Sequence, residues 1–202
     1  MKNLLLLVLV ALLSSCNSTE STPAPDFSIE GFEKTTIPGT ATDYLVRSDV
    51  YDRMLEEGML LNGKKHGLWI TYHDSEKQIP AMIANYVNGK LNGATSEYNN
   101  RGGLTSLKHY TNDVLNGRSI LYSNGRLVEV ADYKDGELHG VRSTYFERSD
   151  QKQTEVHFKD GKQDGTFRYY NEQGAIVMEY LYKDGEKISG GIVEPAKEEA
   201  PE

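Results

Sequence analysis

The sequence has little of several features that mark common protein classes. One cysteine in 202 residues excludes a scaffold built on disulfides. Lys and Arg number 22 against 30 Asp and Glu, and a net charge of -8 argues against nucleic acid as a partner, because phosphate backbones are bound by basic surfaces. No segment beyond an amino-terminal apolar run has a helical period. The 19 glycines and 13 tyrosines instead indicate many short strands and turns.

The amino terminus has the features of an export signal. Lys2 precedes an apolar run at 4–13, which as a helix rises about 15 Å and cannot cross a hydrocarbon core about 30 Å thick. The following Leu13-Ser14-Ser15-Cys16 resembles a bacterial lipobox. This resemblance implies cleavage before Cys16, removal of residues 1–15 and attachment of lipid (diacylglycerol and further acyl chains such as palmitate) to Cys16. A plain secretory signal and a buried thiol are the alternatives.

The rest of the chain divides by composition. Residues 16–43, rich in Ser, Thr, Pro and Glu, are expected to form a flexible stalk behind the lipidated Cys16, with Phe27, Ile29 and Phe32 able to dock as a terminal cap. Residues 44–190 are expected to be repeats, and 191–202 a disordered acidic tail. Asn17 is not the aspartate of an inner-membrane retention mark, so the sequence favours a lipoprotein of the bacterial cell envelope in the outer membrane.

An internal repeat is the strongest signal in the chain. A phrase of the form Asn/Asp-Gly-x-x-x-Gly returns with periods of 26, 24, 23 and 25 residues between its second glycines. A tyrosine stands five residues after each second glycine, and an aromatic residue or Leu60 stands three before the first-glycine position. The turn glycines are Gly63, Gly67, Gly89, Gly93, Gly117, Gly136, Gly140, Gly161, Gly165 and Gly185, and the tyrosine column is Tyr72, Tyr98, Tyr122, Tyr145 and Tyr170.

Asn-Gly and Asp-Gly between β-prone segments predict hairpins, because these residues tolerate the positive φ of tight turns. The predicted fold is therefore all-β: an elongated antiparallel β-meander of about five to six tandem hairpin repeats, with about eleven strands. The motif Tyr/Phe-x-Asn/Asp-Gly-x-x-x-Gly-x-x-x-x-Tyr resembles the MORN-repeat variant of many bacterial proteins. That resemblance implies a twisted sheet that serves as a scaffold or binding module, and one bacterial branch is named as an antitoxin. Asp113 and Leu60 depart from the motif.

The sequence contains no motif for catalysis. Neither a nucleophile elbow nor a zinc-protease motif is present, so we expect no enzyme activity, no cofactor and no bound metal. His66 and His139 occupy a repeat position beside the second glycine and are interpreted as polar turn residues, while His73, His109 and His157 look isolated.

Two sets of aromatic residues are candidates for binding. The tyrosine column is expected to pack repeat against repeat, with a ladder for sugars or peptides as the alternative. Strand alternation places Trp69, Phe167 and Tyr169 on the opposite face, where Thr95, Ser119 and Arg142 replace aromatics in other copies. We therefore expect Trp69, Phe167 and Tyr169 to be partner contacts.

These features favour a non-catalytic, lipid-anchored MORN-like scaffold or binding module that contacts a protein or an envelope polymer such as a glycan. An antitoxin or immunity protein that masks a toxin is the alternative, and an envelope enzyme ranks third. The expected partners are the membrane, through Cys16, and a protein or glycan. A homodimer through open sheet edges is also left open.

Overall fold

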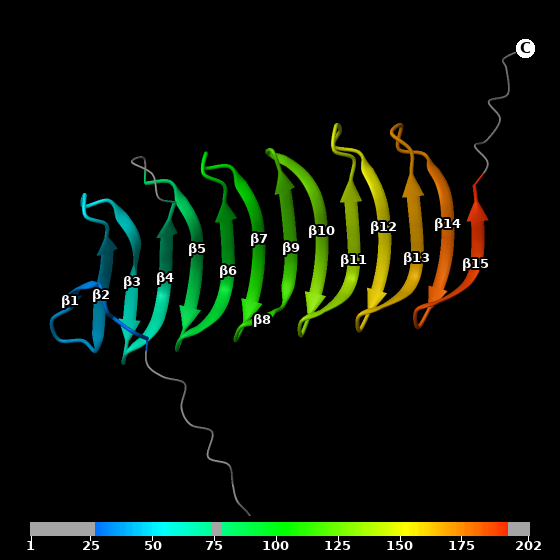
Figure 1. Cartoon of the computed structure of the whole chain (residues 1–202). Coiled ribbons are helices and arrows are strands. Elements are labelled where there is room, and N and C mark those ends of the chain that lie inside the picture. Colours follow the sequence, from blue (N-terminus) through cyan, green and yellow to red (C-terminus); the bar gives the residue numbers. More distant parts are fainter. Residues whose placement is uncertain (1–26, 74–77, 194–202) are drawn as a thin grey trace, which may run out of the picture.

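The computed structural model describes residues 27–73 and 78–193, in which every regular element is a β-strand. They form one antiparallel sheet whose strands follow almost in chain order (Figure 1). The all-β meander predicted from the sequence is confirmed. The strands are β1 (Glu33–Thr36), β2 (Thr42–Ser48), β3 (Met54–Leu61), β4 (Lys64–Tyr72), β5 (Pro80–Val87), β6 (Lys90–Tyr98), β7 (Leu104–Thr111), β8 (Val114–Leu115), β9 (Gly117–Ser123), β10 (Arg126–Lys134), β11 (Glu137–Tyr145), β12 (Lys152–Lys159), β13 (Lys162–Tyr170), β14 (Ile176–Lys183) and β15 (Glu186–Ile192).

The repeat phrase makes the turns along one edge of the sheet. At Asn88-Gly89 and Asp160-Gly161 both residues have positive φ, as a two-residue turn matched to the sheet's twist requires. Asp113, which replaces a glycine, keeps the same turn with φ of 70°, so the departure from the motif does not interrupt the meander. It also accepts a hydrogen bond from the amide of Leu91 through Oδ1 (2.7 Å).

Main-chain hydrogen bonds join each turn to the turn of the previous copy. The amide of Gly89 donates to the carbonyl oxygen of Lys65 (2.8 Å), and the amide of Asp113 donates to Leu91 (3.0 Å). The same bond recurs in Gly136 to Leu115 (2.9 Å), Gly161 to Leu138 (2.9 Å) and Gly185 to Gln163 (2.8 Å). Because each bond needs the same offset between copies, this ladder fixes the phase of the repeat even where the loops at the other edge differ in length.

The second glycine of each copy sits in an irregularity of the strand pairing, opposite the aromatic residue of the next copy. Gly67 faces Tyr86 and Gly165 faces Tyr182. At Gly165 φ is 117°, and a Cβ there would lie 2.9 Å from the Cβ of His157. The position therefore needs glycine both for its backbone conformation and for its space.

The strand register defines two faces, because directly paired residues point to the same side. We call a row a series of residues in which each pairs directly with the next across neighbouring strands. On the Trp69 face, the row that passes through Thr71, two residues after Trp69, is unbroken: Arg47, Glu56, Thr71, Met82, Glu97, Ser106, Leu121, Glu129, Thr144, Thr154, Tyr169, Met178 and Ile192. The Tyr72 face carries the neighbouring row: Val46, Glu57, Ile70, Ile83, Ser96, Leu107, Ile120, Val130, Ser143, Glu155, Arg168, Glu179 and Gly191.

A small hydrophobic core lies on the Trp69 face at the amino-terminal end of the sheet. Phe27 and Phe32 pack on the buried cluster of Leu45, Leu60 and Trp69. Phe27 and Phe32 therefore dock as the terminal cap that the sequence suggested, whereas Ile29, which is 45% exposed, is not part of it. The sheet itself begins at Glu33, inside the range 16–43 that composition predicted to be a stalk, because β1 pairs with β2 and β2 with β3.

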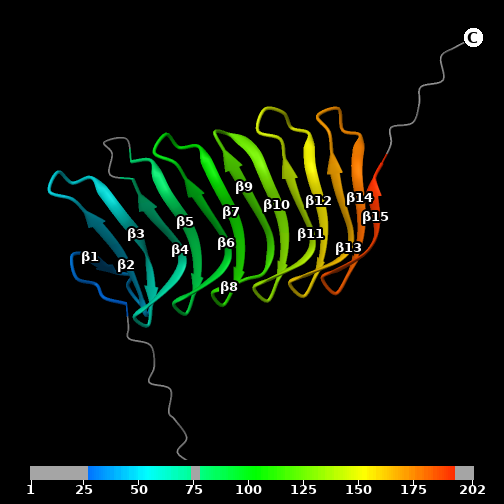
Figure 2. The ribbon, with the colours of Figure 1, turned by 45° about the vertical axis from the view of Figure 1, so that its right-hand side comes forward.

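The molecule is a ribbon whose ends are far apart. Both views show one layer of strands side by side, with β1 and β15 at opposite ends (Figures 1 and 2). At about 4.8 Å per strand the sheet extends on the order of 60 Å. It has more strands than the sequence indicated, since β1 and β2 precede the first full copy, β3 with β4, and β8 is split from β9 at Asn116.

Candidate functional site: an aromatic patch on the Trp69 face

Aromatic side chains gather on the Trp69 face near the carboxyl-terminal end of the sheet. Tyr169 belongs to the row defined above, Phe167 lies two residues before it, and Tyr180 pairs directly with Phe167. We call the aromatic patch the set Phe158, Phe167, Tyr169, Tyr180 and Tyr182, which comes from β12, β13 and β14. All five side chains are half-buried, so each offers part of its ring to solvent.

The patch is held in shape by contacts among its own members and neighbours. The ring centroids of Phe167 and Tyr180 lie 5.9 Å apart with their planes at 38°, and the buried Val156 on β12 pairs directly with Phe167. Lys187 of β15 places its Nζ 4.0 Å from the centre of the Tyr180 ring. A partly exposed aromatic surface with a cation on one ring suits a ligand that has both apolar groups and hydrogen-bonding groups.

Trp69 occupies the same row as Phe167 but is not available to a partner. Its side chain is 1% exposed, because Phe27 and Phe32 pack edge-on against it at 5.1 and 6.2 Å. The expectation that Trp69 is a contact residue is therefore corrected. Its Nε1 donates to the carbonyl oxygen of Met59 (2.8 Å), and Gly58 leaves room for the ring, since a Cβ there would lie 2.2 Å from it.

Two cations and one carboxylate hold the cap over Trp69. Glu56, 7% exposed, accepts from Arg47 and from Lys65, each at 2.8 Å. Arg47 lies over the ring of Phe32 at 5.0 Å, and Lys65 lies over Phe27 at 4.6 Å. These charge pairs on the Trp69 face thus hold the two rings of the cap. The segment that carries Phe27 and Phe32 is therefore an example, within the chain itself, of apolar side chains packed on this face.

The tyrosine column lies on the opposite face, as alternation predicted. Tyr72, Tyr98, Tyr122, Tyr145 and Tyr170 are all half-buried. At the amino-terminal end Tyr44 and Tyr72 both donate their hydroxyl hydrogen to Glu57. This hydrogen bond raises the pKa of Tyr44 to about 12, and burial together with the same carboxylate raises the pKa of Tyr72 above its ordinary range. The column here serves packing and hydrogen bonding within the sheet.

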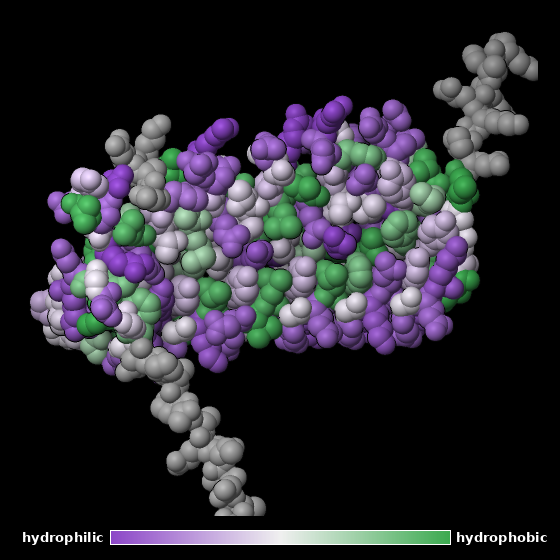
Figure 3. All heavy atoms as spheres, in the orientation of Figure 1, coloured by the Kyte–Doolittle hydropathy of each residue, from purple (hydrophilic) through white to green (hydrophobic). Residues whose placement is uncertain are grey.

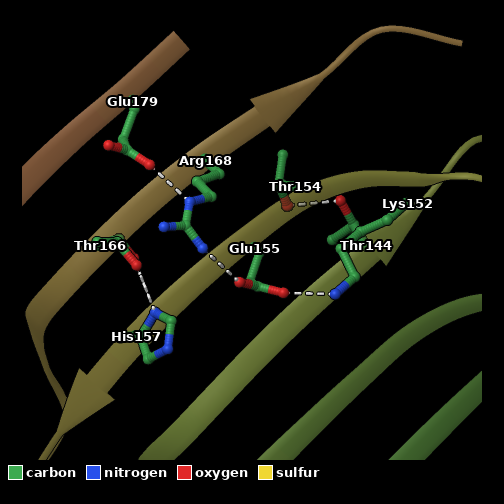
Figure 4. Close-up of polar contacts among 8 residues, drawn as sticks. All are labelled: Thr144, Lys152, Thr154, Glu155, His157, Thr166, Arg168 and Glu179. Carbon is green, nitrogen blue, oxygen red and sulfur yellow. Dashed lines mark hydrogen bonds and ion pairs between the residues drawn. The ribbon is translucent and has the colours of Figure 1, made fainter. Parts of the chain in front are cut away.

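The Tyr72 face changes character along its length. Its row is mainly aliphatic from Ile70 to Val130 and becomes charged at Glu155, Arg168 and Glu179 (Figure 4). Arg168 bonds Glu179 at 2.6 Å and Glu155 at 3.5 Å, and Lys152 also donates to Glu155. The hydrogen bond from Lys152 is the main reason that the pKa of Glu155 lies below its ordinary value.

The histidines take structural positions. His139 Nδ1 lies 3.1 Å from Asp160, while His66 lies in β4 with its Nδ1 buried and without a hydrogen-bond partner. His109 and His157, which looked isolated in the sequence, occupy one repeat position, immediately before the aromatic residue of their copies. Each places Nδ1 3.1 Å from a carbonyl oxygen just after a second glycine, that of Arg118 or Thr166.

The lipidation site and possible metal, membrane and pocket features complete the description of candidate sites. Cys16 lies outside the described residues, as do the signal segment and most of the acidic tail. Within the described residues no group of three or more His, Cys, Asp or Glu side chains could hold a metal, and no helix could cross a membrane. A hollow at the loop edge, lined by Ser123, Arg126, Leu127, Glu147 and Arg148, has a volume of about 290 Å³ and is lined by no histidine or cysteine.

Comparison of the chain with models of known protein families and with curated proteins finds no match. The resemblance to MORN repeats is therefore a prediction from the sequence motif. The geometry adds that each copy is two antiparallel strands, joined by a turn at the Asn/Asp-Gly pair and bonded to the next turn.

Proposed function

We propose that this protein is a non-catalytic, MORN-like binding module, anchored at the bacterial cell envelope through lipid on Cys16, whose aromatic patch binds a protein partner. The observation that carries the proposal is the contrast within one row of the Trp69 face. At its amino-terminal end Trp69 is covered by Phe27 and Phe32, whereas Phe167 and Tyr180 at the other end are only partly buried.

The internal cap indicates the kind of partner that fits. Phe27 and Phe32 flank a turn at Glu30-Gly31, and their rings pack edge-on against Trp69. Phe27 also donates its amide to the carbonyl oxygen of Gly63 (3.2 Å). The patch offers comparable elements to another chain: two adjacent, tilted rings at Phe167 and Tyr180 and a cation at Lys187. A partner segment with aromatic side chains and a nearby carboxylate matches this chemistry.

The surface around the patch is compatible with contact by a folded protein. Figure 3 shows hydrophilic residues along both loop edges of the ribbon and a mixture of hydrophobic and hydrophilic residues between them. A partly apolar surface with a polar rim is the usual anatomy of a protein interface. A lipid on Cys16 would tether the module near the β1 end, so the patch would be presented away from the anchor.

The test is crosslinking in cells, followed by recovery of the tagged protein from its native membrane. The wild type is compared with the double variant Phe167→Ser, Tyr180→Ser, with Tyr122→Ser on the opposite face as the matched control, and with the unlipidated Cys16→Ala. We expect one protein to be recovered with the wild type and with Tyr122→Ser, and at least about tenfold less with the patch variant and with Cys16→Ala.

Two results would count against the proposal. Recovery unchanged in the patch variant, with its fold verified by circular dichroism, would move the binding site elsewhere. A wild type that fractionates with membranes but captures no protein would reject a protein partner, and glycan arrays would then examine the polymer alternative.

A further inference from the structure

The two edges of the sheet are protected to different degrees. The edge strand β1 is only four residues long and is charged, with Lys34 bound to Asp43 at 2.9 Å and Thr36 bonded to the same carboxylate at 2.8 Å. Short, charged edges resist pairing with other chains. Phe27 and Phe32 add a cap at this end of the ribbon.

The other edge is less protected, although β15 carries Glu186 and Lys187 and has a bulge at Ile188. The edge strand β15 is seven residues long, and beyond it no strand of the described chain pairs with its outer side. Ile188 is 60% exposed and Ile192 is 80% exposed, and Val193 follows directly at 39%. A repeat array needs a cap at each end, since an open end leaves apolar side chains and unpaired backbone groups in water.

From this asymmetry we propose that β15 pairs antiparallel with β15 of a second copy of the chain, joining two sheets into one. The strand can pair with itself about its midpoint, Ser189, because a two-fold axis there sets each of its seven residues opposite one residue of the other copy. The two irregular positions of β15, the bulge at Ile188 and the positive φ of Gly190 (106°), then face each other across the axis. In this register Glu186 faces Ile192, Lys187 faces Gly191 and Ile188 faces Gly190, so no two like charges oppose each other. A foreign strand would have to supply this pattern, whereas a second copy supplies it automatically.

The pairing also continues the surfaces of the two copies. A two-fold axis perpendicular to the sheet keeps both Trp69 faces on one side, so the two aromatic patches would flank the new interface. Ile192, which pairs with Met178 on that face, would be covered in part by the other copy. The two β1 ends would then lie at the far ends of the joined sheet. The pairing does not depend on the partner proposed above.

A single disulfide tests the register. The full chain carrying Cys16→Ala has no other cysteine, so Ser189→Cys adds a unique thiol at the proposed axis. Facing Cα atoms in antiparallel strands are about 4.5 or 5.5 Å apart, and both values lie within the disulfide range. We expect mild oxidation to give a covalent dimer from Ser189→Cys and far less from Thr35→Cys, the matched control on β1.

Sedimentation then tests the association without a crosslink. We expect the Cys16→Ala chain to be dimeric, and Ile188→Lys with Ile192→Lys to weaken association at least about tenfold, because charge on an edge strand opposes pairing. Circular dichroism shows whether the lysine variant keeps its strands. The crosslinking of Ser189→Cys is a test that does not rely on weakening the protein, so it stays informative even if the lysine variant fails to fold. A monomeric Cys16→Ala chain, or crosslinking of Ser189→Cys no faster than that of Thr35→Cys, would overturn the proposal.

Discussion

Phe27 packs edge-on against Trp69, with ring centroids 5.1 Å apart, although 42 positions separate them in the sequence. Removing this ring should uncover the tryptophan. The chain has one tryptophan, so tryptophan fluorescence reports the surroundings of Trp69. We expect Phe27→Ala to shift the emission to longer wavelength. It should lower the free energy of unfolding by less than about 3 kcal/mol, the upper value for a fully buried aromatic side chain, because Phe27 is partly buried. Phe167→Ala, far from Trp69, is the control that should leave the emission unchanged.

The second glycines should be harder to replace than the glycines of open turns. Gly125 has φ of 77°, and a Cβ added there would meet no other atom within 4 Å, so Gly125→Ala should cost about 1–2 kcal/mol for the left-handed backbone. Gly165 has φ of 117° and would also press a Cβ against His157 at 2.9 Å. We expect Gly165→Ala to lower the free energy of unfolding by about 1–3 kcal/mol more than Gly125→Ala does. Urea unfolding of both variants measures the difference. Equal losses would mean that the contact with His157 has no effect.

Local chemistry explains why the repeated part of the fold could be predicted. Asn-Gly and Asp-Gly pairs demand a positive φ wherever they occur, so Asn88-Gly89 indicates its turn without help from the rest of the chain. The opposed columns follow from strand alternation, which correctly separated Tyr170 from Phe167 and Tyr169. These signals are carried within one copy of the repeat.

The parts that could not be predicted depend on contacts between distant residues. Composition at 16–43 concealed β1 and the first two residues of β2, which form strands because β1 pairs with β2 and β2 with β3. Trp69 was expected at the surface because nothing near it in sequence shows that Phe27 and Phe32 cover it. The shared position of His109 and His157 was visible in principle, since both precede the aromatic residue of their copies, but only the structure shows the carbonyl groups that they bind.

The charged end of the Tyr72 face should make stability depend on pH. Because Lys152 holds the pKa of Glu155 below its ordinary 4.5, the ionised carboxylate stabilises the fold above about pH 4.5, and this contribution is lost as the pH falls through the lowered pKa. Glu155→Gln should therefore have a lower free energy of unfolding than the wild type at neutral pH, and this difference should become smaller in acid. Urea unfolding of both proteins from neutral pH to below pH 4.5 measures the difference, with Glu186→Gln, at an exposed position, as the control. A difference that stays constant with pH would contradict this assignment.

Removing one copy should shorten the ribbon without unfolding it. Deletion of residues 137–161 takes out β11 and β12 and joins Gly136 to Lys162, which restores the turn phrase and keeps the bond from Gly185 to Gln163. Each strand adds about 4.8 Å, so the maximum dimension in X-ray scattering should fall by about 10 Å. The lysine substitutions at Ile188 and Ile192 keep self-association out of the measurement in both chains.

A compact globule of 202 residues would behave differently. Its radius of gyration would be about 17 Å, against more than about 20 Å expected for a sheet on the order of 60 Å long, and losing an internal segment would unfold it because every part contacts one core. In a repeat array each copy contacts only its neighbours, so β10 meets β13 in place of β11. A deleted chain that keeps its strand content and becomes shorter along one axis supports the ribbon, whereas one that loses its circular dichroism signal contradicts it.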